Sequence, residues 1–287
     1  MIERSSARNV KYQRLRTFNG LTAREWTLLS KNVWNDVSSP RRAHHLQHGA
    51  VYPVKLADRL IRMYSREGDL VLDPFAGVGS TCVAAMAAQR PSIGFELSAE
   101  FAEIAESWIA EERALLSDAA SVELRRGDAL QLIATVSNVQ VTVTSPPYAN
   151  FISRSLDDRR KTHKTSKLVD DNNSRVRVYS EHPADLGNLE YEPFLDRCEL
   201  LLRGLLTATK PGGYAAWVVK DYRLPPERPY IAMHAHIAER AERAGWRWHD
   251  LIVWDQNDQR SLVLLGYPSR FYTNQNCSFI VVLRKPE

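Results

Sequence analysis

The sequence predicts one doubly wound α/β domain built around a mostly parallel sheet, and three observations support this. From residue 56 onward, segments with helical periodicity alternate with short apolar segments, as in repeated β-α-β units. A glycine-rich turn joins the first of these strands to the next helix. The length of 287 residues suits one sizeable core with room for a modest insertion.

The same periodicity predicts where the elements lie. Seven strands are expected at residues 69–73, 92–97, 122–128, 139–144, 214–221, 248–255 and 278–285. The longer helices are expected at residues 56–65, 80–89, 98–116, 192–209 and 231–245. Ser98 is the expected N-cap of the third helix, Lys210-Pro211-Gly212-Gly213 is read as a turn, and the last two strands are expected to close the sheet as an antiparallel pair.

The composition is that of a globular protein, with 44% hydrophobic and 25% charged residues. These values exclude global disorder and a fibrous architecture. No apolar run approaches the roughly 20 residues of a membrane span, and the polar, basic N-terminus lacks the apolar core of a secretory signal. Cys82, Cys198 and Cys277 have neither disulfide nor metal-ligand spacing. We therefore expect a cytoplasmic protein without structural zinc.

Positive charge gathers in two segments. Residues 1–50 carry nine basic side chains against three acidic ones, and residues 151–180 carry eight against four. Because the whole chain has a net charge of +4, the remainder carries −6. An acidic body with basic flanks suits a protein that grips a polyanion, although solvated basic loops have the same composition. We treat residues 1–50 as a basic N-terminal arm and residues 51–287 as the catalytic domain.

A candidate ligand site follows the first strand of the β-α-β series. Asp73 to Thr81 reads D-P-F-A-G-V-G-S-T and leads into a helix, the order that binds nucleotide-like ligands. Glu96 ends the next strand, where a carboxylate can accept hydrogen bonds from both hydroxyls of a ribose. Asp128 ends the third strand and suits either an adenine amino group or a helix cap.

Two other nucleotide sites fit this segment less well. After Gly77 and Gly79 the third position of the dinucleotide fingerprint holds Cys82, and no phosphate-binding Lys follows the glycines. S-adenosylmethionine carries an ammonium and a carboxylate in place of phosphates, and an acid such as Asp73 beside the turn suits its cation. A plain structural turn is the remaining alternative.

A second motif, Thr144-Ser145-Pro146-Pro147-Tyr148, follows the fourth strand at the edge where such folds bind ligands. Two prolines remove two backbone donors and leave carbonyl oxygens facing the cleft. An exocyclic amine is a poor nucleophile, and hydrogen bonds from its N–H groups to Ser145 Oγ and the Pro146 carbonyl would localise its lone pair. Tyr148 offers an aromatic face to a base swung out of the helix.

In these two motifs the sequence resembles the amino-group DNA methyltransferases, particularly the bacterial N4-cytosine and N6-adenine enzymes of restriction and modification systems. Residues 73–81 resemble the family's cofactor loop, Ser145 to Tyr148 its catalytic motif, and residues 50–61 the segment that lies across the methionine moiety. Ser in the first position of the catalytic motif is typical of the N4-cytosine enzymes. The catalytic motif follows the cofactor motif here, whereas many relatives have the opposite order, so the chain looks circularly permuted.

The resemblance implies a seven-stranded fold of the class I methyltransferase type, S-adenosylmethionine as cofactor with S-adenosylhomocysteine as product, and no metal. It implies catalytic roles for Ser145, Pro146, Pro147 and Tyr148. It implies that the cofactor is bound by Tyr52, Pro53, Asp73, Pro74, Phe75, Ala76, Gly77, Gly79, Ser80, Thr81, Glu96, Leu97, Asp128 and Ala129. Duplex DNA, a cognate restriction endonuclease and a second copy of the chain are the partners it suggests.

Residues 149–190 lose all periodicity and are the first candidate for target recognition, with a disordered surface loop as the alternative. Residues 256–275 are a second candidate, because amide and guanidinium groups suit base edges. The expected DNA contacts are Arg154, Arg159, Arg160, Lys161, Lys164, Lys167, Arg175, Arg260 and Arg270. His44, His45 and His48 are read as solvated side chains, because no Cys or carboxylate cluster lies near them.

The predicted function is therefore N4 methylation of cytosine in duplex DNA. Three alternatives remain. The same site could methylate adenine N6, the chain could methylate an amino group of RNA, or it could be a catalytically inactive nucleic-acid-binding protein of the same fold.

Overall fold

The computed structural model describes residues 17–38, 51–149, 180, 182–223, 229–259 and 271–287. Their centre is an eight-stranded sheet in the order β1-β9-β10-β6-β5-β2-β3-β4. Its strands are β1 (Val33–Trp34), β2 (Leu70–Asp73), β3 (Ser92–Glu96), β4 (Val122–Arg126), β5 (Val139–Thr144), β6 (Thr209–Val219), β9 (Arg247–Asp255) and β10 (Cys277–Arg284). The predicted doubly wound, mostly parallel fold is confirmed.

The strand pairing at the end of the chain agrees with the prediction, whereas the number of strands does not. β10 is inserted between β6 and β9 and runs antiparallel to both, so the last two strands form the expected antiparallel pair. The sheet has an eighth strand, since β1 pairs in parallel with the edge strand β9. A two-residue strand is too short to show the alternation that identifies strands in a sequence.

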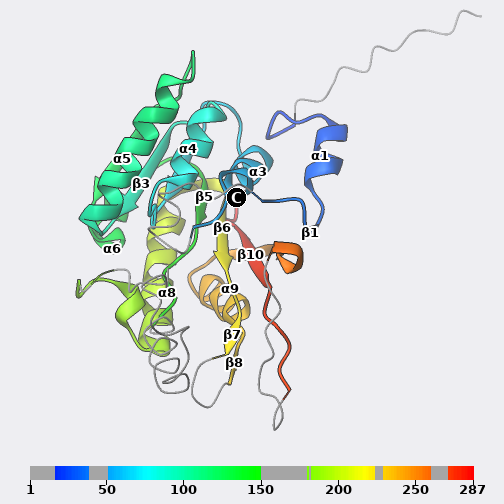
Figure 1. The fold of residues 1–287 in the computed structure, drawn as a ribbon, viewed down its shortest axis with the longest axis vertical. Helices are drawn as coiled ribbons and strands as arrows, with labels where there is room; N and C mark the ends of the chain where they lie inside the picture. The colour runs from blue at the N-terminus through cyan, green and yellow to red at the C-terminus, as the bar shows by residue number, and fades with distance from the viewer. Residues whose placement is uncertain (1–16, 39–50, 150–179, 181, 224–228, 260–270) are drawn as a thin grey trace, which may run out of the picture.

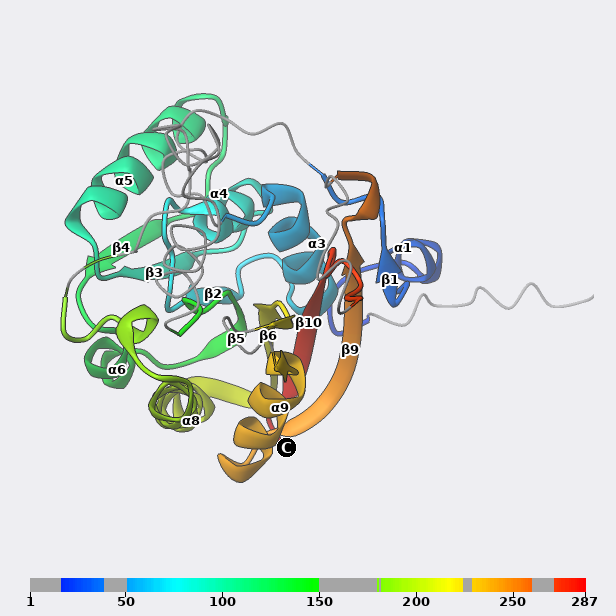
Figure 2. The same cartoon turned by 60° about the horizontal axis from the view of Figure 1, so that its bottom comes forward.

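Helices cover both faces of the sheet, as Figures 1 and 2 show. One face is covered by α3 (Val54–Tyr64), α4 (Ser80–Ala87) and α5 (Ala99–Ala114). The other is covered by α6 (Ala129–Leu132), the 3-10 helix η1 (Ile133–Thr135), α8 (Tyr191–Ala208) and α9 (Met233–Arg243).

β6 shows why both faces must be covered. Ala215, Trp217 and Val219 enter the core under α8 and α9, while Tyr214, Ala216 and Val218 enter the core under α3. All six side chains are buried, so the strand reads as a continuous apolar run.

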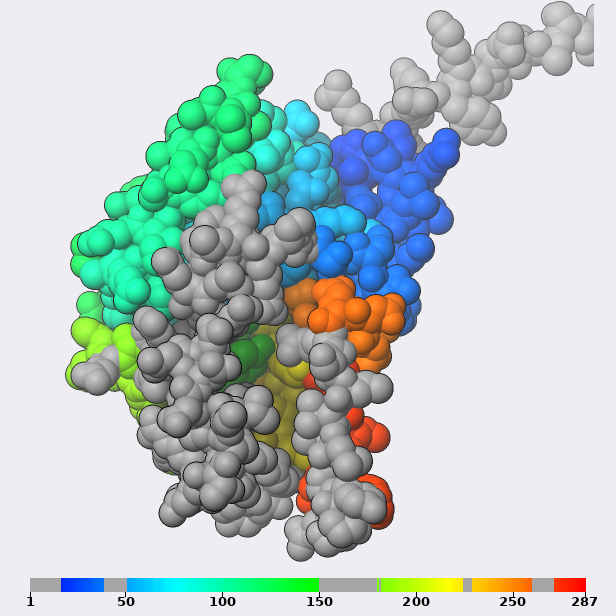
Figure 3. Space-filling view, viewed as in Figure 1, coloured from blue at the N-terminus to red at the C-terminus, as the bar shows by residue number. Residues whose placement is uncertain are grey.

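Part of the predicted N-terminal arm belongs to the folded domain. Residues 17–38 form α1 (Ala23–Leu29), which Thr22 and Glu25 begin with a capping box, and then β1. Trp34 and Val37 are fully buried, and Arg59 of α3 pairs with Asp36 at 2.9 Å. In Figure 3 these blue residues sit against the orange residues near the end of β9. Residues 1–16 and 39–50 lie outside the described residues.

The segment Lys210 to Gly213, read as a turn from the sequence, lies within β6 instead. Its pairing with β5 shifts there, since Val139 faces Thr209 and Val141 already faces Tyr214. Gly212 has a φ of +71°, a backbone conformation that glycine adopts at little cost. The Lys-Pro-Gly-Gly sequence therefore makes an irregularity in the strand and does not interrupt it.

Four smaller elements complete the fold. A two-stranded sheet of β7 (Tyr222–Arg223) and β8 (Tyr230–Ile231) follows β6. The 3-10 helices η2 (Leu186–Asn188) and η3 (Asn257–Gln259) precede α8 and follow β9. Among the described residues, no helix is both long and apolar enough to cross a membrane.

Candidate active site

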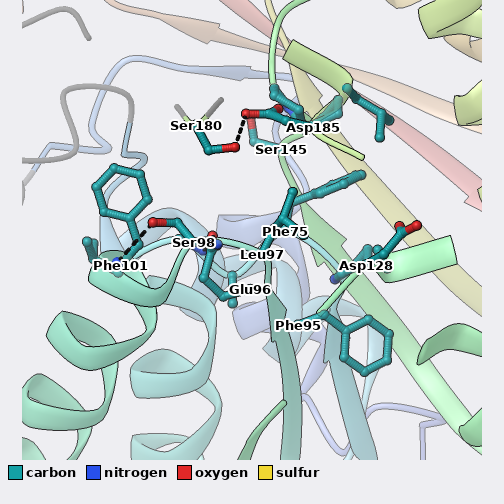
Figure 4. Close-up of a pocket in the computed structure, with 18 of the residues that line it drawn as sticks. Phe75, Phe95, Glu96, Leu97, Ser98, Phe101, Asp128, Ser145, Ser180 and Asp185 are labelled. Atoms are coloured by element: carbon teal, nitrogen blue, oxygen red, sulfur yellow. Dashed lines mark hydrogen bonds between the residues drawn. The ribbon is translucent and has the colours of Figure 1, made fainter. Parts of the chain in front are cut away.

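One pocket opens at the carboxyl ends of the parallel strands, where the loops after β2, β3, β4 and β5 meet (Figure 4). β2 and β5 are neighbours in the sheet, so the loops that follow them lie side by side. The pocket is lined by these predicted site residues: Tyr52, Pro74, Phe75, Ala76, Gly77, Ser80, Glu96, Leu97, Asp128, Ala129, Ser145, Pro146 and Pro147. The two motifs therefore share one cleft, which is the condition for their acting in one reaction.

Five predicted site residues do not line the pocket: Pro53, Asp73, Gly79, Thr81 and Tyr148. Pro53 is the N-cap of α3, and Gly79 is the N-cap of α4 with a φ of +94°. A Cβ atom on Gly79 would come within 3.3 Å of Ala105 on α5. Gly79 therefore serves the close packing of the turn against α5.

The cofactor turn is held against the end of β3. Gly77 N–H donates to Glu96 Oε2 at 2.8 Å, and Ser98 N–H donates to Oε1 at 2.7 Å. Ser98 is also the N-cap of α5, as predicted, and accepts from Phe101 N–H. One carboxylate thus ties the turn after β2 to the start of α5 while it faces the pocket.

Burial raises the pKa of Glu96 from its ordinary 4.5 to about 7, against the lowering effect of the two N–H donors. The charge of Asp73 acts in the same raising direction. The folded protein therefore holds this proton more tightly than the unfolded chain does. The contribution of Glu96 to stability is fully present below pH 4.5 and is lost as the pH rises through about 7.

This pKa predicts a pH-dependent affinity for S-adenosylhomocysteine. The ionised carboxylate is the form that accepts hydrogen bonds from two ribose hydroxyls, so affinity should rise about tenfold from pH 6 to pH 8 and then level off. Isothermal titration calorimetry across this range measures it. Glu96→Gln should bind more weakly with no such rise, and the same pH profile in both proteins would contradict the assignment.

Asp73 is sealed inside the protein and does not face the pocket. It is 1% exposed and accepts from Thr144 Oγ1 and Thr81 Oγ1, both at 2.7 Å, from Tyr52 Oη at 3.0 Å and from Phe75 N–H at 3.1 Å. Burial raises its pKa, and these four hydrogen bonds oppose the rise. In this structure its oxygens face protein donors, and the contact of Asp73 with a cofactor ammonium stays a prediction.

The remaining polar groups of the pocket suit S-adenosylmethionine. Ser80 Oγ is buried and has no hydrogen-bond partner in the described part of the chain, and it lies at the first residue of α4. A hydroxyl at a helix N-terminus suits a carboxylate such as that of methionine. Asp128 caps α6 through Leu130 N–H at 2.9 Å and also lines the pocket, so the helix cap and the adenine contact are compatible.

The loop from Ser145 to Tyr148 is anchored at both ends. Thr144 binds Asp73, and Ala149 is 1% exposed in the core under α8. Tyr148 packs with its ring edge-on to Tyr222, with 6.2 Å between centroids, and lies beside the pocket without lining it.

The pocket also has a wall that sequence reasoning missed. Ser180, Ala184, Asp185 and Leu186 line it from the segment that precedes α8. The sequence offered no signal for them, because they fall within residues 149–190 and match neither motif. The predicted DNA contacts at positions 154–175, 260 and 270, and the three histidines at 44, 45 and 48, lie outside the described residues.

Residues 3–107 match the family model of the N6/N4 DNA methylases, described as DNA methylase. The chain is 48% identical over 84 residues to the Type II methyltransferase M.MthZI of Methanothermobacter thermautotrophicus, which is 28% of this chain and 24% of that protein. It is also 48% identical over 59 residues to the orphan methyltransferase M.BamHII of Bacillus amyloliquefaciens, 21% of this chain and 22% of that protein. These similarities relate part of the chain to DNA methyltransferases of the N6/N4 type.

The matched segments span about a quarter of these relatives' lengths. The family model covers residues 3–107, which include the glycine-rich turn and Glu96. The fold agrees: TrmN from Thermus thermophilus superposes with a TM-score of 0.51 at 18% identity, over 86% of this chain and 54% of that one. The family match supports S-adenosylmethionine as the cofactor. Tyr52, Glu96, Asp128 and the turn from Pro74 to Ser80 are the groups that would hold it.

Proposed function

We propose that the chain methylates the exocyclic N4 amino group of cytosine in duplex DNA. The observation that carries this proposal is that the Phe75 loop and Ser145-Pro146-Pro147 line one shared pocket. The family match supports a DNA amino-methyltransferase, and the Ser of the catalytic motif favours cytosine N4 over adenine N6.

The residues of the pocket suit a direct transfer. S-adenosylmethionine supplies an electrophilic methyl group on a sulfonium. Ser145 Oγ and the Pro146 carbonyl accept hydrogen bonds from the target amine, which localises its lone pair and aligns it for in-line attack. Pro146 is buried and Pro147 half-buried, so the carbonyl is held rigidly. No cysteine lines the pocket among the described residues, and this mechanism needs no covalent enzyme intermediate.

Nucleoside analysis tests the proposed target. Unmethylated plasmid DNA is incubated with the protein and labelled S-adenosylmethionine, digested to nucleosides and separated by mass. We expect N4-methyldeoxycytidine and no N6-methyldeoxyadenosine. The reverse result would assign the chain to adenine, and label that enters structured RNA but not DNA would overturn the DNA substrate.

The partners are also proposals. Duplex DNA would be bound by the basic residues of positions 154–175 and by Arg260 and Arg270, whose contacts would weaken steeply with salt. The Type II names of several relatives suggest a restriction endonuclease that acts on the same site. Resistance of methylated plasmid to such a nuclease would support that pairing. A homodimer and a cytoplasmic location stay predictions.

A further inference from the structure

A third carboxylate lies in the pocket wall beside the catalytic serine. Asp185 is 5% exposed, lines the same pocket as Ser145, and comes from the segment between residue 180 and α8. In Figure 4, Ser145, Ser180 and Asp185 gather at one end of the pocket, away from Glu96 and Asp128. Neither motif of the sequence includes Asp185, and the mechanism above leaves it without a role.

The carboxylate of Asp185 is only partly satisfied by the protein. Ser180 Oγ donates to Oδ2 and Gly187 N–H donates to Oδ1, each at 2.8 Å. No Lys, Arg or His of the described residues forms an ion pair with it. Each carboxylate oxygen has capacity for a second hydrogen bond. A buried charge without a full set of donors is costly, so this position favours a ligand that brings an N–H group.

The other three carboxylates of the site either have a full set of hydrogen-bond donors or suit another part of the cofactor. Asp73 is enclosed by four protein donors. Glu96 lies at the end of β3, suited to a ribose, and Asp128 at the end of β4, suited to an adenine. Asp185 is the acid that lies at the Ser145 end of the pocket, where the reacting amine is expected.

We propose that Asp185 is a catalytic residue that accepts a hydrogen bond from the target amine and takes the proton that the amine loses. This rests on the proposed function. As the nitrogen lone pair forms the new N–C bond, the C–S bond breaks and its electron pair stays on sulfur. The methylated nitrogen then has one proton too many, and that proton passes to the Asp185 carboxylate and on to solvent. The neutral Ser145 and Pro146 acceptors cannot hold that proton, whereas a carboxylate can.

The alternative role of Asp185 is structural, because it caps η2 through Gly187. Asn caps a helix about as well as Asp does. Asp185→Asn therefore keeps the hydrogen bond to Gly187 N–H and removes the charge and the proton acceptor. The melting temperature of the Asp185→Asn variant should match that of the wild-type protein.

The first test measures methyl transfer to plasmid DNA. Asp185→Asn should lower kcat about 100-fold or more, as expected when a general base is lost, and should leave the affinity for S-adenosylhomocysteine within about twofold. Ser180→Ala is the matched control, because it removes one hydrogen bond to the carboxylate and keeps the carboxylate. Equal losses of kcat in the two variants would make Asp185 a structural residue and overturn the proposal.

The second test needs no nucleic acid. Sinefungin carries an amine where the cofactor carries its sulfonium methyl, so that amine should lie next to the acceptors of the target amine. Asp185→Asn should lose about tenfold in sinefungin affinity through a lost charge-assisted hydrogen bond, with S-adenosylhomocysteine affinity unchanged. An equal loss of affinity for both ligands would place Asp185 against the methionine ammonium. Unchanged affinity for both would show that Asp185 does not lie where the methyl group is transferred, and would overturn the proposal.

These tests separate two kinds of failure. If the unaltered protein transfers no methyl group to DNA but Asp185→Asn loses sinefungin selectively, the DNA substrate is wrong and the placement of Asp185 stands. If transfer occurs and Asp185→Asn keeps full kcat, the proposed function stands and the role of Asp185 is wrong.

Discussion

Ser145→Ala should abolish most methyl transfer while the protein still binds its cofactor. Ser145 follows β5, is half-buried and lines the pocket beside Pro146. Its proposed role is to accept a hydrogen bond from the target amine. Loss of one preorganised polar contact to a reacting group typically costs about 100- to 1000-fold in kcat. Single-turnover transfer to plasmid DNA measures the loss, and calorimetry with S-adenosylhomocysteine measures cofactor affinity.

Ser145→Thr is the control for this variant. It keeps a hydroxyl on the same carbon, so it should recover part of the lost rate, although the added methyl group crowds the pocket. An alanine variant that lost cofactor affinity and turnover in equal measure would contradict the role assigned to Ser145, since that role concerns the amine.

Asp73→Ala should instead destabilise the whole site. The substitution removes the acceptor of three buried hydroxyl groups, on Tyr52, Thr81 and Thr144, and of Phe75 N–H. Each donor left without an acceptor costs about 1–3 kcal/mol, and the costs are not additive. Thr81 Oγ1 keeps the Val143 carbonyl as a second acceptor at 3.4 Å. We therefore expect a loss of about 3–5 kcal/mol in the free energy of unfolding, measured by urea denaturation, with lower cofactor affinity and lower turnover together.

Asp69→Ala is the matched control for Asp73→Ala. Asp69 lies at the opposite end of β2 and pairs with Lys210 at 3.0 Å near the surface, where such a pair contributes about 1 kcal/mol or less. Asp73→Asn should fall between the two, because its amide oxygen can still accept from Thr144. A stable Asp73→Ala protein that lost only cofactor affinity would restore Asp73 as a ligand of the cofactor.

The link through Asp73 bears on the order of the motifs. Thr144 immediately precedes Ser145, and Thr81 and Phe75 belong to the glycine-rich turn, so one carboxylate joins the two loops. The resemblance to the amino-group DNA methyltransferases implies the opposite order of these motifs in many members of that family. The order does not affect the site, because β2 and β5 are neighbours in the sheet and their carboxyl ends meet at one edge in either case.

The N-terminal region shows where local patterns fail. Its basic side chains suggested an arm, yet Trp34 is fully buried, donates from Nε1 to Lys31 O and lies under the Arg59 guanidinium at 4.7 Å. The partners of Trp34 in α3 and β9 are far along the chain. That β1 forms the edge of the sheet therefore depends on tertiary contacts, which the local sequence does not show.

The sequence by itself determined the β-α-β order, the cofactor turn, the acid at the end of β3 and the Ser-Pro-Pro-Tyr loop, because each is a short pattern whose residues act on their immediate neighbours. The tertiary structure alone decided which carboxylates line the pocket. Burial and hydrogen bonding close Asp73 off from the pocket, while the segment before α8 folds over the strand ends and brings in Asp185. Accessibility of a charged group depends on every element packed around it, and no local pattern in the chain records that.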